Sequence, residues 1–340
     1  MDRGGAGDPV RLGHGAPELR ARPRVAQRSG VTAVFPPLVG NLTLVDLLLL
    51  LAPVLIVPLG LRLLPFQGPR ARQLLGAARL LQPIGAATAI VSFLFAPGVV
   101  AGAIALGWLI SCGVTSLAGL IEVIERRSLR PVQLVSAAAA AYLSVGAAWL
   151  VVSRAGIRPL GFSPEIVELT GVHFHYAGFA ATLMAALAVV ALRDRGKLAT
   201  MSSAAALLVV AGVPITAGGI TTGSGFLTIL GPVLLAAGVL TIAALTALAI
   251  APRIESAMAR WLLWLSAAGV VVPMLLAVDY AISRVFPVPA LDLRAMALIH
   301  GDLNALAFSL AGLLGWTMVR RERESRESGR RMLLQRQEQR

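Results

Sequence analysis

The fold of this chain is decided by an apolar stretch near its middle, residues 168–192, which reads ELTGVHFHYAGFAATLMAALAVVAL. The stretch is long enough to cross a membrane, because a spanning helix needs about 20 mostly apolar residues. Two of the four histidines of the chain, His173 and His175, lie inside it. An ionisable side chain at the centre of a membrane helix costs roughly 2.5–3.5 kcal/mol on translocon scales, so such residues usually have a role. The stretch therefore predicts both a transmembrane helix and a candidate functional site.

The composition of the whole chain is typical of a membrane protein. Of its 340 residues, 57% are hydrophobic and 14% are charged, whereas soluble domains have about 45–50% apolar and about 25% charged residues. The formal net charge of +13 is spread over loop ends and both tails. This distribution favours a role in membrane orientation and argues against nucleic-acid binding. The single cysteine, Cys112, excludes an internal disulfide and a cysteine-ligated metal cluster.

Further apolar stretches of spanning length predict an all-α bundle of nine transmembrane helices. Their expected bounds are 42–64, 79–95, 99–120, 131–152, 168–192, 200–220, 226–249, 260–282 and 294–319. We expect three regions, which are a disordered leader at 1–40, a transmembrane helical domain at 41–319 and a charged cytoplasmic tail at 320–340. The leader is rich in Gly, Pro and Arg without a sustained apolar periodicity, which is typical of disorder.

Basic residues indicate the orientation of the bundle in a cell membrane. The connections after the first, third, fifth and seventh predicted spans hold 12 Lys and Arg residues, and the alternate connections hold four. Because basic residues favour the cytoplasmic side, the amino terminus is expected outside and the carboxyl terminus in the cytoplasm. The eight Arg of the tail agree with this orientation, whereas the six Arg of the leader do not. Glu122 and Glu125, beside Arg126 and Arg127 at the cytoplasmic end of the third span, are expected to form interfacial ion pairs.

In this orientation, most ionisable groups of the spans lie at one depth near the external side. His173 and His175 are two residues apart, about 200° on a helix, so they point in opposite directions and the fifth span needs polar neighbours on two sides. On the ninth span, His300 and Asn304 share a face at i and i+4. The candidate substrate- or proton-binding residues are Glu168, His173, His175, Tyr176, Asp279, His300, Asp302 and Asn304.

Three chemical roles suit such a set of side chains. Neutral imidazoles ligate transition metals and haem iron, so His173, His175 and His300 are the candidate metal ligands. Histidine with carboxylates passes protons, because the imidazole pKa lies near neutrality. The same groups bind a polar solute beside a gate. The alternative, in which each histidine only donates a hydrogen bond across a helix interface, stays open.

Three segments in the second half of the chain together resemble one family. The run His173-Phe-His-Tyr-Ala-Gly-Phe179, with His300-Gly-Asp-Leu-Asn-Ala-Leu-Ala-Phe308 and Gly315-Trp316, resembles the YndJ-like family of bacterial integral membrane proteins. The resemblance covers most of the chain from about Leu42 to Val319. It implies a multi-pass protein of the bacterial inner membrane, often described as a transporter from its topology alone, and it assigns no substrate.

A shorter stretch is similar to a second family. His173-Phe174-His175-Tyr176 is similar to the haem-ligand motif of haem-copper oxidase subunit I, in which the two histidines face opposite ways and ligate two haems. That family needs further histidines, and this chain offers only His300 within a span, because His14 lies in the leader. A respiratory oxidase is therefore excluded, while a smaller haem or transition-metal site stays open.

These observations lead to one principal hypothesis and two alternatives. The principal hypothesis is a YndJ-like protein in the lipid bilayer that moves or binds a small solute, an ion or protons through the external histidine and carboxylate site. ATP-driven transport by this chain alone is excluded, because it contains no Gly-x-x-x-x-Gly-Lys-Ser/Thr motif for binding ATP. The first alternative is a haem- or metal-binding redox protein that uses His173, His175 and His300. An intramembrane enzyme is disfavoured, because no Ser/His/Asp pattern or His-Glu-x-x-His site is present.

Overall fold

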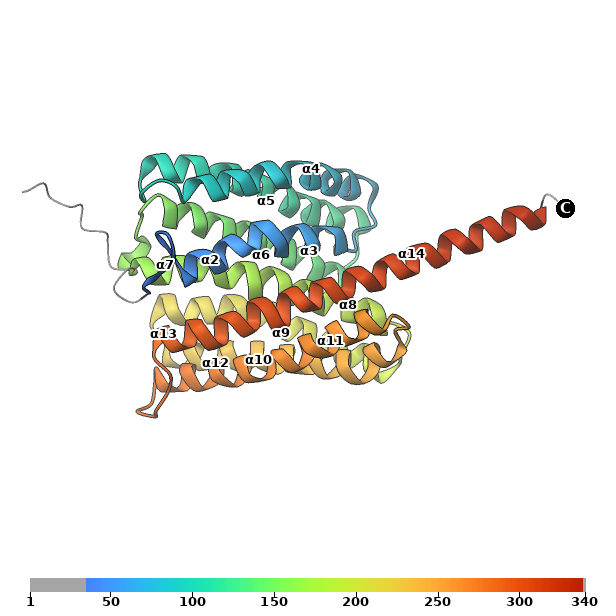
Figure 1. The fold of residues 1–340 in the computed structure, drawn as a ribbon. Coiled ribbons are helices and arrows are strands. Elements are labelled where there is room, and N and C mark those ends of the chain that lie inside the picture. Colours follow the sequence, from blue (N-terminus) through green and yellow to red (C-terminus); the bar gives the residue numbers. More distant parts are fainter. Residues whose placement is uncertain (1–34, 339–340) are drawn as a thin grey trace, which may run out of the picture.

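Residues 35–338 are described by the computed structural model, and they contain nine helices long and apolar enough to cross a membrane (Figure 1). The all-α bundle and the order of its spans are therefore confirmed for this part of the chain. A short antiparallel hairpin of β1 (Pro37–Val39) and β2 (Leu42–Thr43) precedes the first span. Residues 1–34 of the predicted disordered leader lie outside the described residues. The rest of the predicted leader, residues 35–40, includes strand β1.

The first four spans follow one another with short connections. The first span consists of α2 (Leu44–Leu51), the π-helical segment η1 (Ala52–Ile56) and α3 (Val57–Leu63). The next three spans are the single helices α4 (Pro69–Ser92), α5 (Val99–Arg126) and α6 (Pro131–Arg154). Helix α4 therefore begins at residue 69 and not at the expected residue 79.

The last five spans include several segments of π-helix. After the short 3-10 turn η2 (Pro159–Gly161), the fifth span consists of α7 (Pro164–His173), π-helical η3 (Phe174–Ala181) and α8 (Thr182–Leu192). The sixth span is α9 (Lys197–Thr222), and the seventh is α10 (Gly225–Leu245), π-helical η4 (Thr246–Ile250) and the 3-10 turn η5 (Ala251–Arg253). The eighth span is α11 (Ala257–Gly269) and α12 (Val271–Ser283). The ninth is α13 (Leu293–Met296), π-helical η6 (Ala297–Gly301) and η7 (Leu303–Leu310), and α14 (Ala311–Glu338), which projects beyond the bundle (Figure 1).

The first turn of α4 is capped by two carboxylates from α5. Glu122 accepts hydrogen bonds from the backbone N–H groups of Gln67 and Gly68, at 3.0 and 2.8 Å. Glu125 accepts from the next free N–H groups, those of Arg70 and Ala71, at 3.2 and 3.1 Å. Carboxylates at a helix N-terminus satisfy free N–H groups and oppose the positive end of the helix dipole. The expectation that these glutamates form ion pairs is corrected, because their oxygens bind backbone groups.

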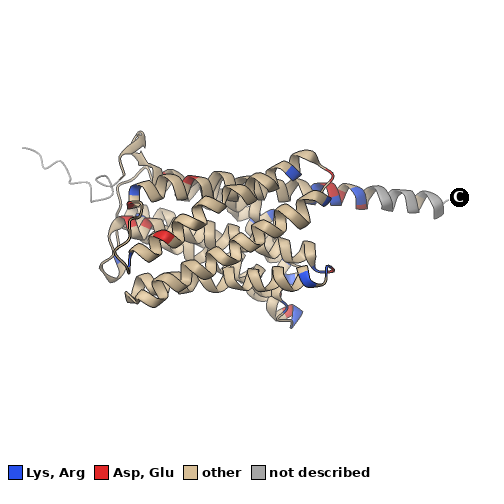
Figure 2. Ribbon diagram, turned by 90° about the horizontal axis from the view of Figure 1, so that it is seen from below, with Lys and Arg blue, Asp and Glu red and all other residues tan. Residues whose placement is uncertain are grey.

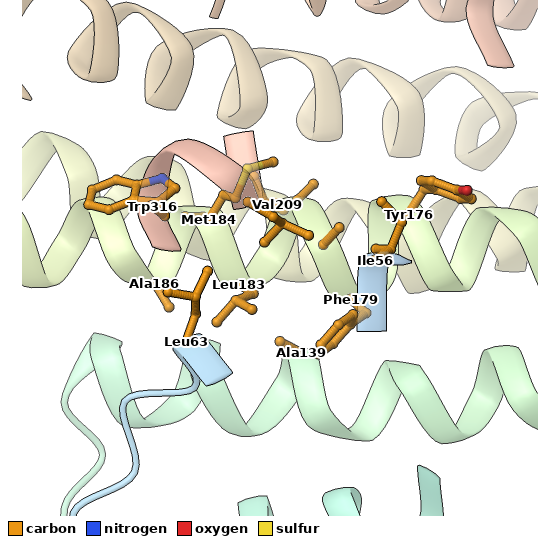
Figure 3. Close-up of a cluster of buried hydrophobic side chains, with 14 of the residues drawn as sticks. Ile56, Leu63, Ala139, Tyr176, Phe179, Leu183, Met184, Ala186, Val209 and Trp316 are labelled. Carbon is orange, nitrogen blue, oxygen red and sulfur yellow. The ribbon is translucent and has the colours of Figure 1, made fainter. Parts of the chain in front are cut away.

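The fifth span lies at the centre of the bundle. In its most apolar stretch 78% of the residues are buried, compared with 33–56% in the corresponding stretches of the other spans. Figure 3 shows its side chains Phe179, Leu183 and Met184 among residues of the first, fourth, sixth and ninth spans. The central position expected from the two opposed histidines is therefore observed.

The sixth and seventh spans approach each other closely through glycine. A Cβ atom on Gly219 of α9 would lie 2.6 Å from the backbone nitrogen of Thr228 in α10, and one on Gly231 would overlap the backbone of Thr216. Small residues permit such close packing of membrane helices. The contact fixes the positions of Thr216 and Thr228, which both belong to the site described below.

The two ends of the bundle differ in charge. Figure 2 shows Lys and Arg concentrated at the end from which α14 projects. We call this the basic end, and it carries Arg62, Arg126, Arg193 and Arg253. The other end, called the opposite end, carries the connections that precede α7 and α13.

Candidate functional site

A cavity of about 300 Å³ lies among the fifth to ninth spans, and we call it the inner cavity. Most of its lining is aliphatic or aromatic, with Leu48 of the first span closing one side. The polar side chains that line it are His173, Tyr176, Thr216, Thr228, Tyr280, Arg284, His300, Asn304 and Ser309. Arg284 is the one charged side chain in this lining among the described residues. Small-molecule sites commonly combine a mostly apolar wall with a few placed polar groups.

The inner cavity continues into a wider space at the opposite end of the bundle. This space, which we call the vestibule, has a volume of about 1080 Å³ and is lined in part by the connection between the eighth and ninth spans, including Val288 and Leu291. His173, Tyr280 and Arg284 line both spaces. They therefore lie where the vestibule meets the inner cavity.

His173 presents an unpartnered ring atom at this junction. Its Nε2 atom is buried and has no hydrogen-bond partner in the described structure. The ring meets Phe174 edge to face, with the ring centroids 6.5 Å apart and the planes at 88°. A buried polar atom without a partner is costly, unless a ligand or water satisfies it. His173 is therefore the strongest single candidate for ligand contact.

His300 and Asn304 line the inner cavity from the ninth span, as their i, i+4 spacing predicted. The Nδ1 atom of His300 lies 2.8 Å from the carbonyl oxygen of Pro273. Because a carbonyl only accepts, Nδ1 carries the hydrogen, and in the neutral ring Nε2 is left as an acceptor. The Asn304 amide donates to the backbone oxygen of His300 at 2.8 Å. Segments η3 and η7 touch, so the fifth and ninth spans are in contact beside the inner cavity.

His175 points away from the inner cavity and is fully buried. Its Nδ1 lies 2.7 Å from the carbonyl oxygen of Gly171 and therefore donates to it, and its Nε2 accepts from the indole N–H of Trp108 at 3.1 Å. The two rings are nearly parallel, with planes at 18° and centroids 6.0 Å apart. Both ring nitrogens are thus used within the protein. For this histidine, the structure favours the alternative in which it only makes hydrogen bonds across a helix interface.

Tyr176 has both a structural contact and a place in the cavity wall. Its hydroxyl donates to the backbone oxygen of Leu48 at 2.8 Å, which joins the fifth span to the first. Its ring lines the inner cavity one helical turn from His173. The residue therefore shapes the site, while its hydroxyl is already bonded.

The three carboxylates among the predicted site residues line neither space. Glu168 is 3% exposed and lines neither space, and its buried Oε1 atom has no hydrogen-bond partner in the described structure. Asp279 is exposed on the outer surface of α12, and Asp302 lies on another side of the ninth span from His300. The structure therefore brings His173, His300 and Asn304 together without these carboxylates.

The lining includes residues that the sequence did not single out. Thr216, Thr228, Tyr280, Arg284 and Ser309 all lie in it, and the buried hydroxyl of Ser309 has no hydrogen-bond partner in the described structure. Threonine and serine are common in membrane helices, so nothing in the pattern separates these from structural hydroxyls. The signal that would have found Arg284 is its position one helical turn after Tyr280, at the end of a span.

The three candidate metal ligands do not form one site. Among residues 35–338, no group of three or more His, Cys, Asp or Glu side chains is placed to hold a metal ion. His175 would have to give up the hydrogen bond from the Trp108 indole to its Nε2 atom to become a ligand. Only His173 and His300 present free ring atoms to the same cavity, and structural and catalytic zinc or iron sites ordinarily use three or more protein ligands. The residues present therefore do not fit a haem or metal centre held by all three histidines.

The candidate residues coincide with π-helical segments. Segment η3 begins directly after His173, and η6 and η7 contain His300, Asn304 and Ser309. A π-helical turn widens the helix and alters which side chains face inward, and such turns occur frequently at functional sites. The π-helical segments therefore indicate the same part of the bundle as the inner cavity for the functional site.

Comparison with known proteins places the chain in a family. A family model described as YndJ-like protein matches residues 47–308, which is well over half of the chain. The chain belongs to the YndJ-like family. The match in this YndJ-like protein includes His173, His300 and Asn304 and therefore nearly all of the inner cavity. No curated protein and no solved structure shows a significant match to it.

Proposed function

We propose that this YndJ-like protein is a membrane transporter whose inner cavity binds a small organic anion with an apolar body. The observation that carries this proposal is the position of His173, whose unpartnered Nε2 lies where the vestibule meets the inner cavity. A volume of about 300 Å³ lies at the small end of the range of about 300–1,000 Å³ for ligand sites. The solute is therefore small.

The charged side chains around the inner cavity favour one class of solute. Arg284 is exposed at the mouth of both spaces, and no carboxylate lines the inner cavity among the described residues. A positive group at the entrance of an apolar cleft attracts anions. His173, His300 and Asn304 then supply polar contacts deeper in the cavity. A short-chain or aromatic monocarboxylate combines these requirements.

The orientation proposed from the sequence sets the direction of access. The basic end would face the cytoplasm under the positive-inside rule, with the amino terminus outside. The vestibule would then open to the external side. A proton relay is less well supported than solute binding, because Glu168, Asp279 and Asp302 lie outside the cavity lining.

Counterflow in proteoliposomes tests the proposal. Vesicles with purified protein would be loaded with unlabelled benzoate or butyrate and diluted into the radiolabelled acid, with benzamide as the uncharged control. We expect saturable accumulation of the acid, and at least a tenfold lower rate in His173→Ala and in Arg284→Gln. Asp279→Asn, which changes a charge outside the cavity, serves as the matched control and should transport normally. Equal rates in the parent and both cavity variants would refute the assignment of the site.

A further inference from the structure

A second polar cavity lies at the basic end of the bundle, far along the spans from the site described above. It has a volume of about 370 Å³, and we call it the basic cavity. Its polar lining consists of Gln67, Glu122, Arg126, Arg130, Gln133, Ser136, Arg193 and Ser203. Three arginines thus line one space that is formed by α5, α6, α8, α9 and the connection before α4.

The connection between α5 and α6 brings two of these arginines together. Arg127 ends α5 in the left-handed conformation, with φ of 43°, which reverses the chain within a few residues. Arg126 and Arg130, on either side of this turn, therefore line the same space. Arg193, at the end of α8, completes the group.

Glu122 does not neutralise the three arginines by pairing with them. It is the one carboxylate in the lining among the described residues, and it is 2% exposed. Its Oε2 atom accepts from two backbone N–H groups at the start of α4. Arg193 pairs with the exposed Asp194 beside it, with Nε and Oδ2 3.1 Å apart, whereas Arg126 and Arg130 form no ion pair within the described residues. The lining therefore keeps an excess of positive charge.

The first turn of α6 adds to this attraction. Pro131, Val132 and Gln133 line the basic cavity, so the N-terminus of a 24-residue helix faces it. The N-terminal end of a helix carries partial positive charge and favours phosphate groups. Arginine binds phosphate oxygens through paired N–H donors. The arginines and the N-terminus of α6 therefore both favour a phosphate group as the ligand.

An orphaned acceptor points to a second feature of the ligand. The side-chain Oε1 of Gln133 is buried and has no hydrogen-bond partner in the described structure. An amide oxygen requires a donor, which a bare phosphate diester lacks. A hydroxyl carried by the same ligand would satisfy it. The surroundings are apolar, because Val189 and Val190 also line the cavity and Leu129 and Met201 are exposed nearby on the bundle surface.

We propose that the basic cavity binds the phosphate of an anionic lipid whose headgroup carries a hydroxyl, the chemistry of phosphatidylglycerol. The arginines and the start of α6 hold the phosphate, and Gln133 accepts from the headgroup hydroxyl. The acyl chains lie along the exposed apolar side chains beside the cavity. Basic pockets between helix ends on the cytoplasmic side commonly hold anionic lipid headgroups.

Native mass spectrometry of the full chain in detergent tests this proposal. The protein would be exposed to phosphatidylglycerol or to phosphatidylcholine with the same acyl chains, and the bound lipid counted after gentle delipidation. We expect preferential retention of phosphatidylglycerol. Each of Arg126→Gln, Arg130→Gln and Arg193→Gln should lower that retention about fivefold, and Arg253→Gln, an equal charge change at the same end outside the cavity, should not.

Two further experiments identify the source of the phosphate and control for misfolding. Inorganic phosphate and glycerol phosphate would be tested as competitors, and displacement of the lipid by either at equal concentration would overturn the assignment to a lipid. Ser203→Phe fills the cavity without removing an arginine and should also lower retention while leaving the melting temperature near that of the parent. Equal retention of the two lipids by the parent, or unchanged retention in the arginine variants, would refute the proposal.

Discussion

His173 and His175 differ in role although they are two residues apart, and a matched pair of substitutions separates the roles. His175→Ala removes a ring that is 0% exposed and bonded at both nitrogens. His173→Ala removes a ring that borders a cavity and has a free Nε2. We expect the first change to destabilise the protein strongly and the second to leave its stability nearly unchanged.

The expected magnitude follows from the contacts of His175. Hydrogen bonds between membrane helices are worth about 0.6 kcal/mol on average and at most about 1.7 kcal/mol, and His175→Ala leaves the Trp108 indole N–H without its acceptor. Truncation of a large buried side chain to Ala costs about 3–5 kcal/mol through lost packing and the cavity that remains. The packing of Gly146 against the ring, where a Cβ atom would lie 2.8 Å from Nδ1, leaves little freedom to collapse. We therefore expect a loss of about 3–5 kcal/mol for His175→Ala and less than about 1 kcal/mol for His173→Ala.

Equilibrium unfolding in mixed micelles of dodecyl sulfate and a mild detergent, followed by circular dichroism, measures these differences. His175→Gln should recover part of the loss, because its amide oxygen can accept from Trp108. A double-mutant cycle with Trp108→Phe should give a coupling energy of about 0.5–1.5 kcal/mol. Equal destabilisation by His173→Ala and His175→Ala would refute the separation of roles, as would a loss below about 0.5 kcal/mol for His175→Ala.

Three more predictions concern the caps, the helix packing and the histidines as ligands. Glu122→Gln should lower the free energy of unfolding by about 1.5–3 kcal/mol, because it weakens charge-assisted hydrogen bonds from backbone N–H groups. The control Glu255→Gln, at an exposed position, should leave this free energy unchanged. Equal effects of the two substitutions would contradict the capping role of Glu122. Gly231→Ala should cost about 1–3 kcal/mol through overlap with Thr216, whereas Gly76→Ala, with open space around it, should not destabilise the protein in the same titration. Elemental analysis of the purified protein should give the same substoichiometric amounts of iron, copper and zinc in the parent and in a variant with both His173→Ala and His300→Ala. If the parent held near-stoichiometric metal and the variant did not, the redox hypothesis would be restored.

Helix number and the opposed directions of the histidines could be predicted from the sequence, because both depend on local regularity. Apolar length fixes whether a helix can span a membrane, and a separation of two residues on a helix fixes opposite faces. The central position of the fifth span followed from His173 and His175 by the same reasoning. The ends of helices were less predictable, since α4 begins at residue 69 through caps supplied by Glu122 and Glu125, more than 50 residues away in sequence.

The makeup of the cavity could not be predicted from the sequence, because it depends on contacts between spans. Glu168, Asp279 and Asp302 lie towards the same end of their spans as His173 and His300, but rotation of their helices turns them away from the inner cavity. Depth along a span is readable from position, whereas helix rotation is set by packing against neighbours. The π-helical segments near His173 and His300 shift that rotation further, and the sequence carries no clear sign of them.

The central claim is that the inner cavity is open to the external side, and cysteine accessibility tests it most directly. In a Cys112→Ala background, Asn304→Cys and Thr228→Cys would place single thiols in the cavity, and Leu306→Cys would place one on the exposed apolar face of the same helix as Asn304. A small, membrane-impermeant thiosulfonate anion would be added to right-side-out membrane vesicles. We predict rapid modification of the two cavity thiols and none of the thiol at position 306. Modification of the cavity thiols only from the cytoplasmic side, or from neither side, would contradict the account.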